Sequence, residues 1–87
     1  MHSHNSNFHK ELISVTTGNS IFNGYYYGDY DVLGLCQKYG TIVAVLPVSS
    51  VNNSGMFAYV ANDNSVVRGL HTEANASMGI RILFYKK

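Results

Sequence analysis

Short apolar runs recur along this chain at near-regular spacing, and each run closes at Gly, Asn, Asp or Ser. Seven such runs fit into the 87 residues, and none of them has a convincing helical period. This pattern is typical of a small all-β domain, either a sandwich or a barrel. Because strands this short leave little room for an internal active site, we expect function on loops or on an assembled surface.

The turn residues divide the chain into a series of antiparallel strands. Gly18-Asn19, Asn23-Gly24 and the triplet 62–64 supply residues that tolerate positive φ, as tight turns require. We therefore predict a polar leader over 1–10, followed by a single small antiparallel β-sandwich, of jelly-roll type, over 11–87. Only segment 71–77 leaves room for a helical turn. The expected strands are 11–17, 20–27, 32–37, 41–48, 55–61, 65–70 and 78–85.

The composition describes one globular domain with few charges. Hydrophobic residues make up 46% of the chain, whereas charged residues make up 13%, about half the usual share of roughly 25%. A weakly charged small β-domain has sheet edges to protect, and assembly with other copies is one way to protect them. The net charge of +1 and the scattered Lys and Arg residues argue against a nucleic-acid partner, whose binding rests on phosphate neutralisation. No apolar run approaches the ~20 residues that membrane insertion requires.

Segment 41–48 is apolar on both faces of the strand that it predicts, with the sequence Thr-Ile-Val-Ala-Val-Leu-Pro-Val. A strand of this kind is buried on both sides, and other subunits can supply one of the two coverings. The last strand places Met78, Ile80, Ile82 and Phe84 on one face, because side chains alternate. We therefore expect the chain to assemble with other copies of itself. Its predicted interface residues are Ile42, Val43, Val45, Leu46, Ile80 and Ile82.

The most distinctive local cluster is Tyr-Tyr-Tyr-Gly-Asp-Tyr-Asp over 25–31. In a strand, Tyr25 and Tyr27 face one way and Tyr26 faces the other. Tyrosine combines an apolar ring with a polar hydroxyl, so it can stack on a sugar ring and also reach its hydroxyl groups. We predict a ligand-binding surface made by Tyr25, Tyr27, Asp29 and the loop residue Asn53. The alternative interpretation is packing in the core or at a subunit interface, because strands favour tyrosine.

Other side chains offer weaker signals for metal binding or catalysis. In an extended strand, His2 and His4 point the same way and are the only weak candidates for a transition-metal site. We expect no cofactor. Arg68, His71 and Glu73 are close enough in sequence for general acid–base work, but no nucleophile with a partner accompanies them. The simpler expectation is that Arg68 and Glu73 form an ion pair or make contacts at the rim of an interface, and we predict no enzymatic activity.

The order of elements resembles the C-terminal, receptor-binding domains of bacteriophage tail-fibre and baseplate proteins. The likeness rests on Tyr-Asp-Val-Leu-Gly-Leu over 30–35, the apolar strand 41–48, the strand 57–60 with its following turn, and the closing Gly-Ile-Arg-Ile-Leu-Phe-Tyr-Lys over 79–86. The resemblance implies a β-sandwich that trimerises at the distal end of a fibre. It also implies an extracellular, virion-borne domain that attaches to a saccharide or protein of the host surface.

Two alternatives from other classes remain open at the level of sequence. The first is a monomeric, lectin-like module that belongs to a secreted protein and uses the same tyrosines. The second is a purely structural trimerisation domain that binds no ligand. An exposed aromatic surface in a monomer would favour the lectin-like module, whereas a threefold apolar interface would favour the fibre tip.

Overall fold

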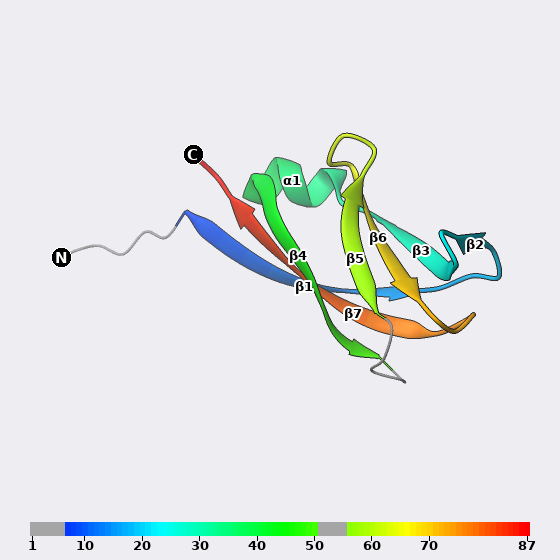
Figure 1. Ribbon diagram of the computed structural model, residues 1–87. Helices are drawn as coiled ribbons and strands as arrows, with labels where there is room; N and C mark the ends of the chain where they lie inside the picture. Colours follow the sequence, from blue (N-terminus) through cyan, green and yellow to red (C-terminus); the bar gives the residue numbers. More distant parts are fainter. Residues whose placement is uncertain (1–6, 51–55) are drawn as a thin grey trace.

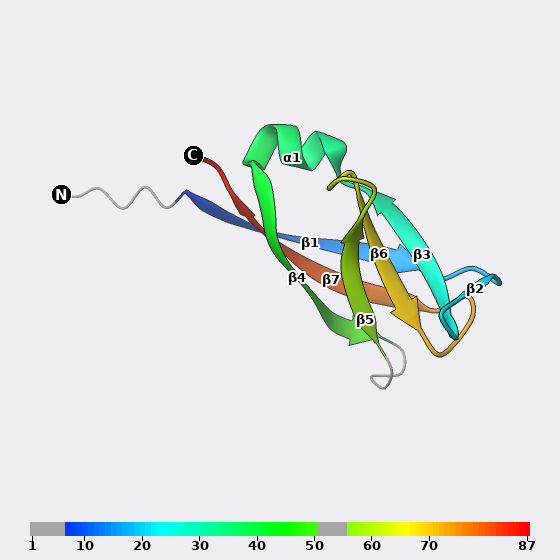
Figure 2. The ribbon, with the colours of Figure 1, turned by 45° about the horizontal axis from the view of Figure 1, so that its top comes forward.

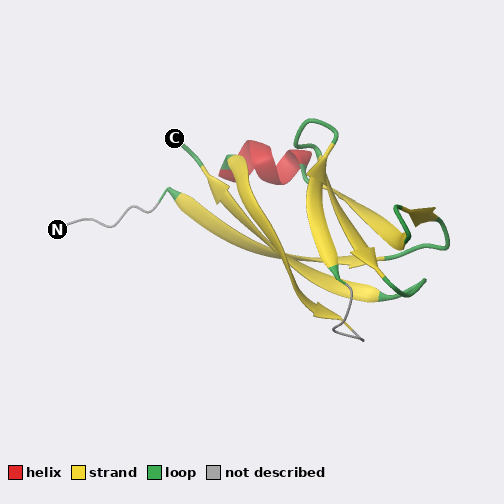
Figure 3. Cartoon of the chain, viewed as in Figure 1, coloured by secondary structure: helices red, strands yellow, loops and turns green. Residues whose placement is uncertain are grey.

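The computed structural model describes residues 7–50 and 56–87, which form strands and one short helix (Figures 1 and 3). Both the strand content and the antiparallel pairing confirm the predicted all-β class. Among the described residues, no helix is long and apolar enough to cross a membrane. The elements are β1 (Phe8–Thr16), β2 (Ile21–Phe22), β3 (Tyr25–Asp31), α1 (Leu33–Tyr39), β4 (Thr41–Ser50), β5 (Phe57–Ala61), β6 (Val66–His71) and β7 (Ser77–Tyr85).

The strands form two antiparallel sheets that pack face to face (Figure 2). One sheet has the order β1-β7-β4, and the other has the order β2-β3-β6-β5. The sheets are joined where β1 ends, because the backbone N–H of Gly18 donates a hydrogen bond of 3.0 Å to the carbonyl of Tyr27. Strand β1 begins at Phe8, opposite Tyr85, so the sheet starts three residues earlier than the predicted boundary between leader and domain.

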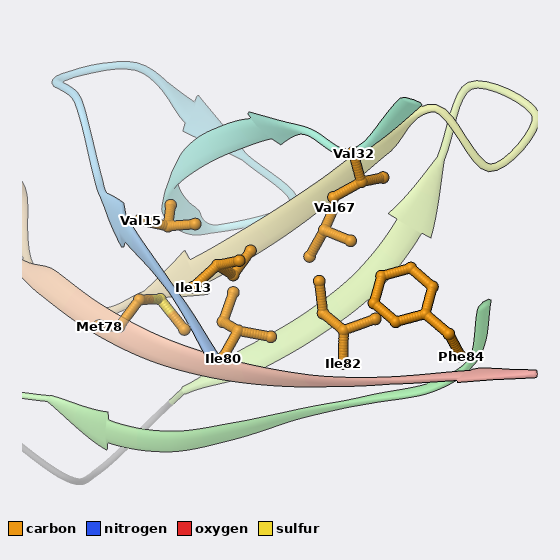
Figure 4. Close-up of a cluster of buried hydrophobic side chains, with 8 residues drawn as sticks. All are labelled: Ile13, Val15, Val32, Val67, Met78, Ile80, Ile82 and Phe84. Atoms are coloured by element: carbon orange, nitrogen blue, oxygen red, sulfur yellow. The ribbon is translucent and has the colours of Figure 1, made fainter. Parts of the chain in front are cut away.

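The core lies between the two sheets and follows from the alternation of side chains (Figure 4). Strand β7 directs Met78, Ile80, Ile82 and Phe84 inward, as the sequence predicts, and all four are almost fully buried. Ile13 and Val15 of β1 join them from the neighbouring strand. Val32 and Val67 complete the cluster from the side of the other sheet.

This core corrects part of the predicted trimer interface. Ile80 and Ile82 are both 0% exposed within a single chain, so neither side chain has surface left for a partner. Ile42 and Val45 also pack against the core. A single chain therefore partly covers one face of β4 without any subunit. Of the six predicted residues, Val43 and Leu46 remain well exposed.

The strand predicted over 32–37 is wrong, because this segment forms the helix α1. Val32, Leu35, Cys36 and Tyr39 lie at positions i, i+3, i+4 and i+7, which is the spacing of one helical face. Val32 belongs to the buried cluster and the other three pack against it. The Asp31 carboxylate accepts a hydrogen bond of 3.0 Å from the Leu33 N–H, and this interaction satisfies a donor at the start of the helix.

Gly40 ends the helix with a positive φ of 109°, a conformation that L side chains rarely adopt. Its N–H donates to the carbonyl of Cys36 at 2.8 Å. The helical turn that the sequence allows within 71–77 does not form. Instead, the Thr17 hydroxyl bridges this segment, donating to the carbonyl of Glu73 and accepting from the N–H of Ala76. A strand end therefore satisfies the polar groups that a helix would have paired internally.

Burial raises the pKa of the Cys36 thiol above its ordinary value, because desolvation disfavours the thiolate. Since the thiolate is the reactive form, we expect a disulfide reagent to label the folded protein several-fold more slowly at neutral pH than the chain unfolded in denaturant. The labelling rate of the folded protein should rise as the pH approaches the raised pKa. Equal rates for the folded and unfolded chain would show that Cys36 is solvated.

Candidate binding site on the outer face of the four-stranded sheet

The outer face of the sheet β2-β3-β6-β5 carries a cluster of aromatic side chains. Its register follows from Gly28 and Gly69, which pair with each other and turn toward the opposite sheet. Residues one position away on either side of these glycines consequently point to the outer side of the sheet. The side chains on this outer face include Phe22, Tyr25, Tyr27, Asp29, Phe57, Tyr59, Arg68 and Leu70.

The rings on this face contact one another across strand boundaries. Tyr25 of β3 meets Phe57 of β5 edge to face, with ring centroids 5.1 Å apart. Phe22 of β2 lies 6.4 Å from Tyr59 and 6.2 Å from Tyr27. Aromatic pairs at these separations are mutually attractive. We call the surface formed by Phe22, Tyr25, Tyr27, Phe57 and Tyr59 the aromatic face.

Arg68 lies within the aromatic face and is already paired. Its Nε and Nη2 atoms donate to the two carboxylate oxygens of Asp29, at 2.7 Å and 2.9 Å. The guanidinium also lies over the rings of Tyr27 and Phe22, at 4.4 Å and 5.1 Å from their centroids. The hydrogen bonds to Asp29 raise the pKa of Arg68 above its ordinary value. The cation is therefore fixed in place and largely neutralised by its neighbour.

A cleft of about 470 Å³ opens on the aromatic face at the end where β3 and β5 begin. This volume lies within the range of ligand-binding clefts, ~300–1,000 Å³. The walls are mainly aromatic, and Leu70, which is nearly buried, also lines it. The residues that line the cleft are Phe22, Asn23, Tyr25, Phe57, Ala58, Tyr59 and Leu70.

The structure brings together three of the four residues that the sequence indicates for ligand binding. Tyr25, Tyr27 and Asp29 share the outer face, with Tyr26 directed to the other side as predicted. Asn53 lies outside the described residues. Sequence reasoning missed Phe22, Phe57 and Tyr59. A signal existed for each, because the Asn23-Gly24 turn sets Phe22 opposite Tyr25, and Phe57 and Tyr59 alternate along one predicted strand.

The remaining candidates are not assembled into a site. Arg68 points outward, whereas His71 is fully buried and lies on the inner side of β6. The expected pairing of Arg68 with Glu73 is wrong, because Arg68 pairs with Asp29. His71 Nδ1 instead accepts a hydrogen bond of 2.9 Å from the backbone N–H of Glu73. Within residues 7–50 and 56–87, no three His, Cys, Asp or Glu side chains come together as metal ligands; His2 and His4 lie outside this part.

Comparison with family models, with curated proteins and with solved structures found no match to this chain. The fold and the outer face define its class: a small all-β domain of two packed antiparallel sheets, with an aromatic outer surface on one of them. In this surface Phe22 and Phe57 are exposed and the three tyrosines are half-buried.

Proposed function

We propose that this domain is a non-enzymatic binding module for neutral saccharides and that the aromatic face is its binding surface. The observation that carries the proposal is the set of aromatic rings that β2, β3 and β5 hold around a cleft of about 470 Å³. Packing of the core between the sheets requires no such cluster of rings on the outer side of a sheet. Large exposed aromatic surfaces on a small soluble domain are typical of interaction sites.

The chemistry of this face suits a sugar ring. The C–H-rich side of a pyranose can lie flat against Tyr25 or Phe57, while tyrosine hydroxyls and the Asn23 amide can exchange hydrogen bonds with its hydroxyl groups. When a sugar ring is buried in this way, water leaves both the sugar face and the aromatic ring, and this loss of exposed apolar surface favours binding. Because the rings of Tyr25 and Phe57 already touch at 5.1 Å between centroids, little side-chain freedom is lost on binding.

The Arg68–Asp29 pair favours an uncharged ligand over an anionic one. Nucleic-acid bases also stack on exposed rings, but such sites combine the rings with cations that track the phosphates. On the aromatic face the cation is Arg68, and its guanidinium already donates hydrogen bonds to both carboxylate oxygens of Asp29. An anionic ligand would have to displace Asp29. The same surface could also receive a protein of the host surface, which the glycan test below separates from a saccharide.

In the setting that the sequence resemblance implies, we place this module at the tip of a phage tail fibre or baseplate protein, outside the cell. Three copies around a fibre axis would multiply weak saccharide contacts into firm attachment without a deep pocket. Val43 and Leu46 are the residues of the predicted trimer interface that a single chain leaves exposed. If light scattering finds a monomer at all concentrations, the predicted trimer is wrong and the lectin-like alternative is favoured.

The saccharide proposal predicts that Tyr25→Ala and Phe57→Ala each weaken binding about tenfold, the loss of roughly one stacking contact. Binding is screened on an array of neutral oligosaccharides and then measured by tyrosine fluorescence, which is usable because the chain contains 7 Tyr and no Trp. Tyr30→Ala is the matched control, since Tyr30 belongs to the same strand, is exposed, and has the register of the other side.

Three results would contradict this proposal. One is an array that shows no neutral saccharide bound above background by the folded protein. Another is a ligand whose affinity falls equally in Tyr30→Ala and in Tyr25→Ala. The third is preferential binding of acidic glycans, because it would mean that Arg68 is available to anions despite its contact with Asp29. Unchanged circular dichroism of each variant establishes that a loss of binding is not a loss of fold.

A further inference from the structure

The charges of this chain are distributed unevenly over the two sheets, although its net charge is only +1. Lys10 and Arg81 lie on the outer side of the sheet β1-β7-β4, as their positions beside Leu83 and Leu12 in the register show. Lys38, Lys86 and Lys87 line one cleft with Phe8, His9 and Tyr39, at the end where β1 begins and β7 ends. Five of the six cations therefore lie either on the outer side of this sheet or at this end of it.

The carboxylates lie mainly on the other side. Asp29 and Asp31 belong to β3, Asp63 lies in the turn after β5, and Glu73 follows β6. Glu11 alone belongs to the sheet of β1, and it is engaged by His9 at 2.7 Å. The basic residues that are scattered in the sequence thus gather over the outer side and one end of one sheet, where they create a positive field. Such a field attracts an anionic partner.

The same outer surface is strongly apolar. Leu12 and Leu46 are 58% and 60% exposed, and they flank Arg81 from β1 and β4 in one row across the sheet. In the next row, Leu83 lies between Lys10 and Ala44. A groove of about 300 Å³ runs among Lys10, Ala44, Leu46, Arg81 and Leu83. We call this surface, with Leu12, the aliphatic face.

An aromatic edge continues the aliphatic face toward the lysines. Phe8 and Tyr85 form a cross-strand pair with ring centroids 5.1 Å apart, and both rings are well exposed. The start of β1, the end of β7 and α1 gather at this end of the molecule (Figure 2). Aliphatic side chains, an aromatic edge and long cationic side chains therefore follow one another over one surface.

We propose that the aliphatic face binds the surface of an anionic phospholipid membrane. Peripheral membrane binding requires apolar side chains that enter the boundary between headgroups and acyl chains, together with cations at the level of the headgroups. Leu12, Leu46 and Phe8 supply the first component. Lys10 and Arg81 supply the second, because their long stems can extend from the apolar surface to the phosphates. A polyanion without an apolar part would leave the exposed leucines uncovered.

This membrane site is separate from the saccharide site and points in the opposite direction. It shares Leu46 with the predicted trimer interface, so a trimer contact at Leu46 and membrane binding exclude each other. A domain bound to a bilayer through β1-β7-β4 would present the sheet β2-β3-β6-β5, with its aromatic face, to the solution. The inference therefore does not depend on the saccharide proposal. The two are distinguished by variants that affect only one face.

The test is co-sedimentation with vesicles of phosphatidylcholine alone and of phosphatidylcholine with about a third phosphatidylglycerol. We expect binding to the anionic vesicles only, and its loss near 0.5 M salt, where the Debye length is roughly 4 Å. Lys10→Gln combined with Arg81→Gln should weaken partitioning roughly 20- to 30-fold. Leu12→Ser combined with Leu46→Ser should also weaken it at least tenfold. Phe57→Ala is the control on the opposite face and should bind vesicles as the parent does.

Four outcomes would overturn the proposal. The first is equal partitioning of the parent to neutral and anionic vesicles, or no partitioning at low salt. The second is a loss of binding in the lysine–arginine variant with full binding in the leucine variant, which would indicate a polyanion. The third is light scattering that shows an oligomer of the parent and a monomer of Leu46→Ser, because other copies would then cover the face. The fourth is a loss in Phe57→Ala equal to that of the leucine variant.

Discussion

Gly28→Ala is expected to destabilise the domain by about 3 kcal/mol or more. A Cβ atom at this position would overlap the carbonyl oxygen of Thr16 and would lie 2.7 Å from Cγ1 of Val15. The first of these is a backbone atom of β1, so no change of rotamer can relieve the overlap. The two sheets would have to move apart at this point. Because domains of this size are stable by roughly 5–15 kcal/mol, the loss is readily measured by urea unfolding.

Gly34→Ala provides the matched control for this substitution. Gly34 lies within α1, and a Cβ atom added there would meet no other atom within 4 Å. Alanine there should stabilise the protein by about 0.5–1 kcal/mol, since glycine is costly inside a helix. If Gly28→Ala proved no less stable than Gly34→Ala, the close approach of β3 to β1 would be refuted. Gly69→Ala should fall between them, because its nearest neighbour is the flexible side chain of Met78.

The strands could be predicted from the sequence because their signals are local. The alternation in β7 and the turns around β2 and β3 can be recognised from residues that are adjacent in the sequence. The helix α1 was missed for a physical reason. Its apolar residues, Val32, Leu35, Cys36 and Tyr39, cover only two turns, and so short a helix has little stability of its own. Packing of this face against the core stabilises it, and that packing is a tertiary property.

The candidate site could be predicted only in part for a similar reason. The alternation of Tyr25, Tyr27 and Asp29 places them on one face whatever the rest of the fold. Their neighbours Tyr59 and Arg68 depend on the order β3-β6-β5, which pairs residues far apart in sequence. The same lack of information about distant residues explains why the sequence places Ile80 and Ile82 at a subunit interface. Alternation showed that they share a face, but it could not show that Val32 and Val67 of the same chain cover that face.

Phe84→Ala is the second substitution with a large expected effect, a loss of about 3–5 kcal/mol. Phe84 is fully buried, and its ring lies 5.8 Å from that of Tyr39 and 6.3 Å from that of His9. It thereby connects α1 and β1 to the central strand of its sheet. Removing the ring leaves a cavity that the paired backbones of β1, β7 and β4 cannot collapse to fill. The melting temperature should fall by more than 10 °C, at about 4–8 °C per kcal/mol.

Phe57→Ala removes the same atoms from a residue on the outer surface instead of the core, and it therefore separates stability from binding. Phe57 is half exposed and belongs to the aromatic face, so we expect a cost of only about 1 kcal/mol and a loss of saccharide binding. Phe84→Ala, measured well below its melting temperature, should retain the saccharide affinity of the parent. If the two variants lost stability equally, the rings of the aromatic face would be part of the core. An unchanged affinity in Phe57→Ala would instead move the binding surface elsewhere on the domain.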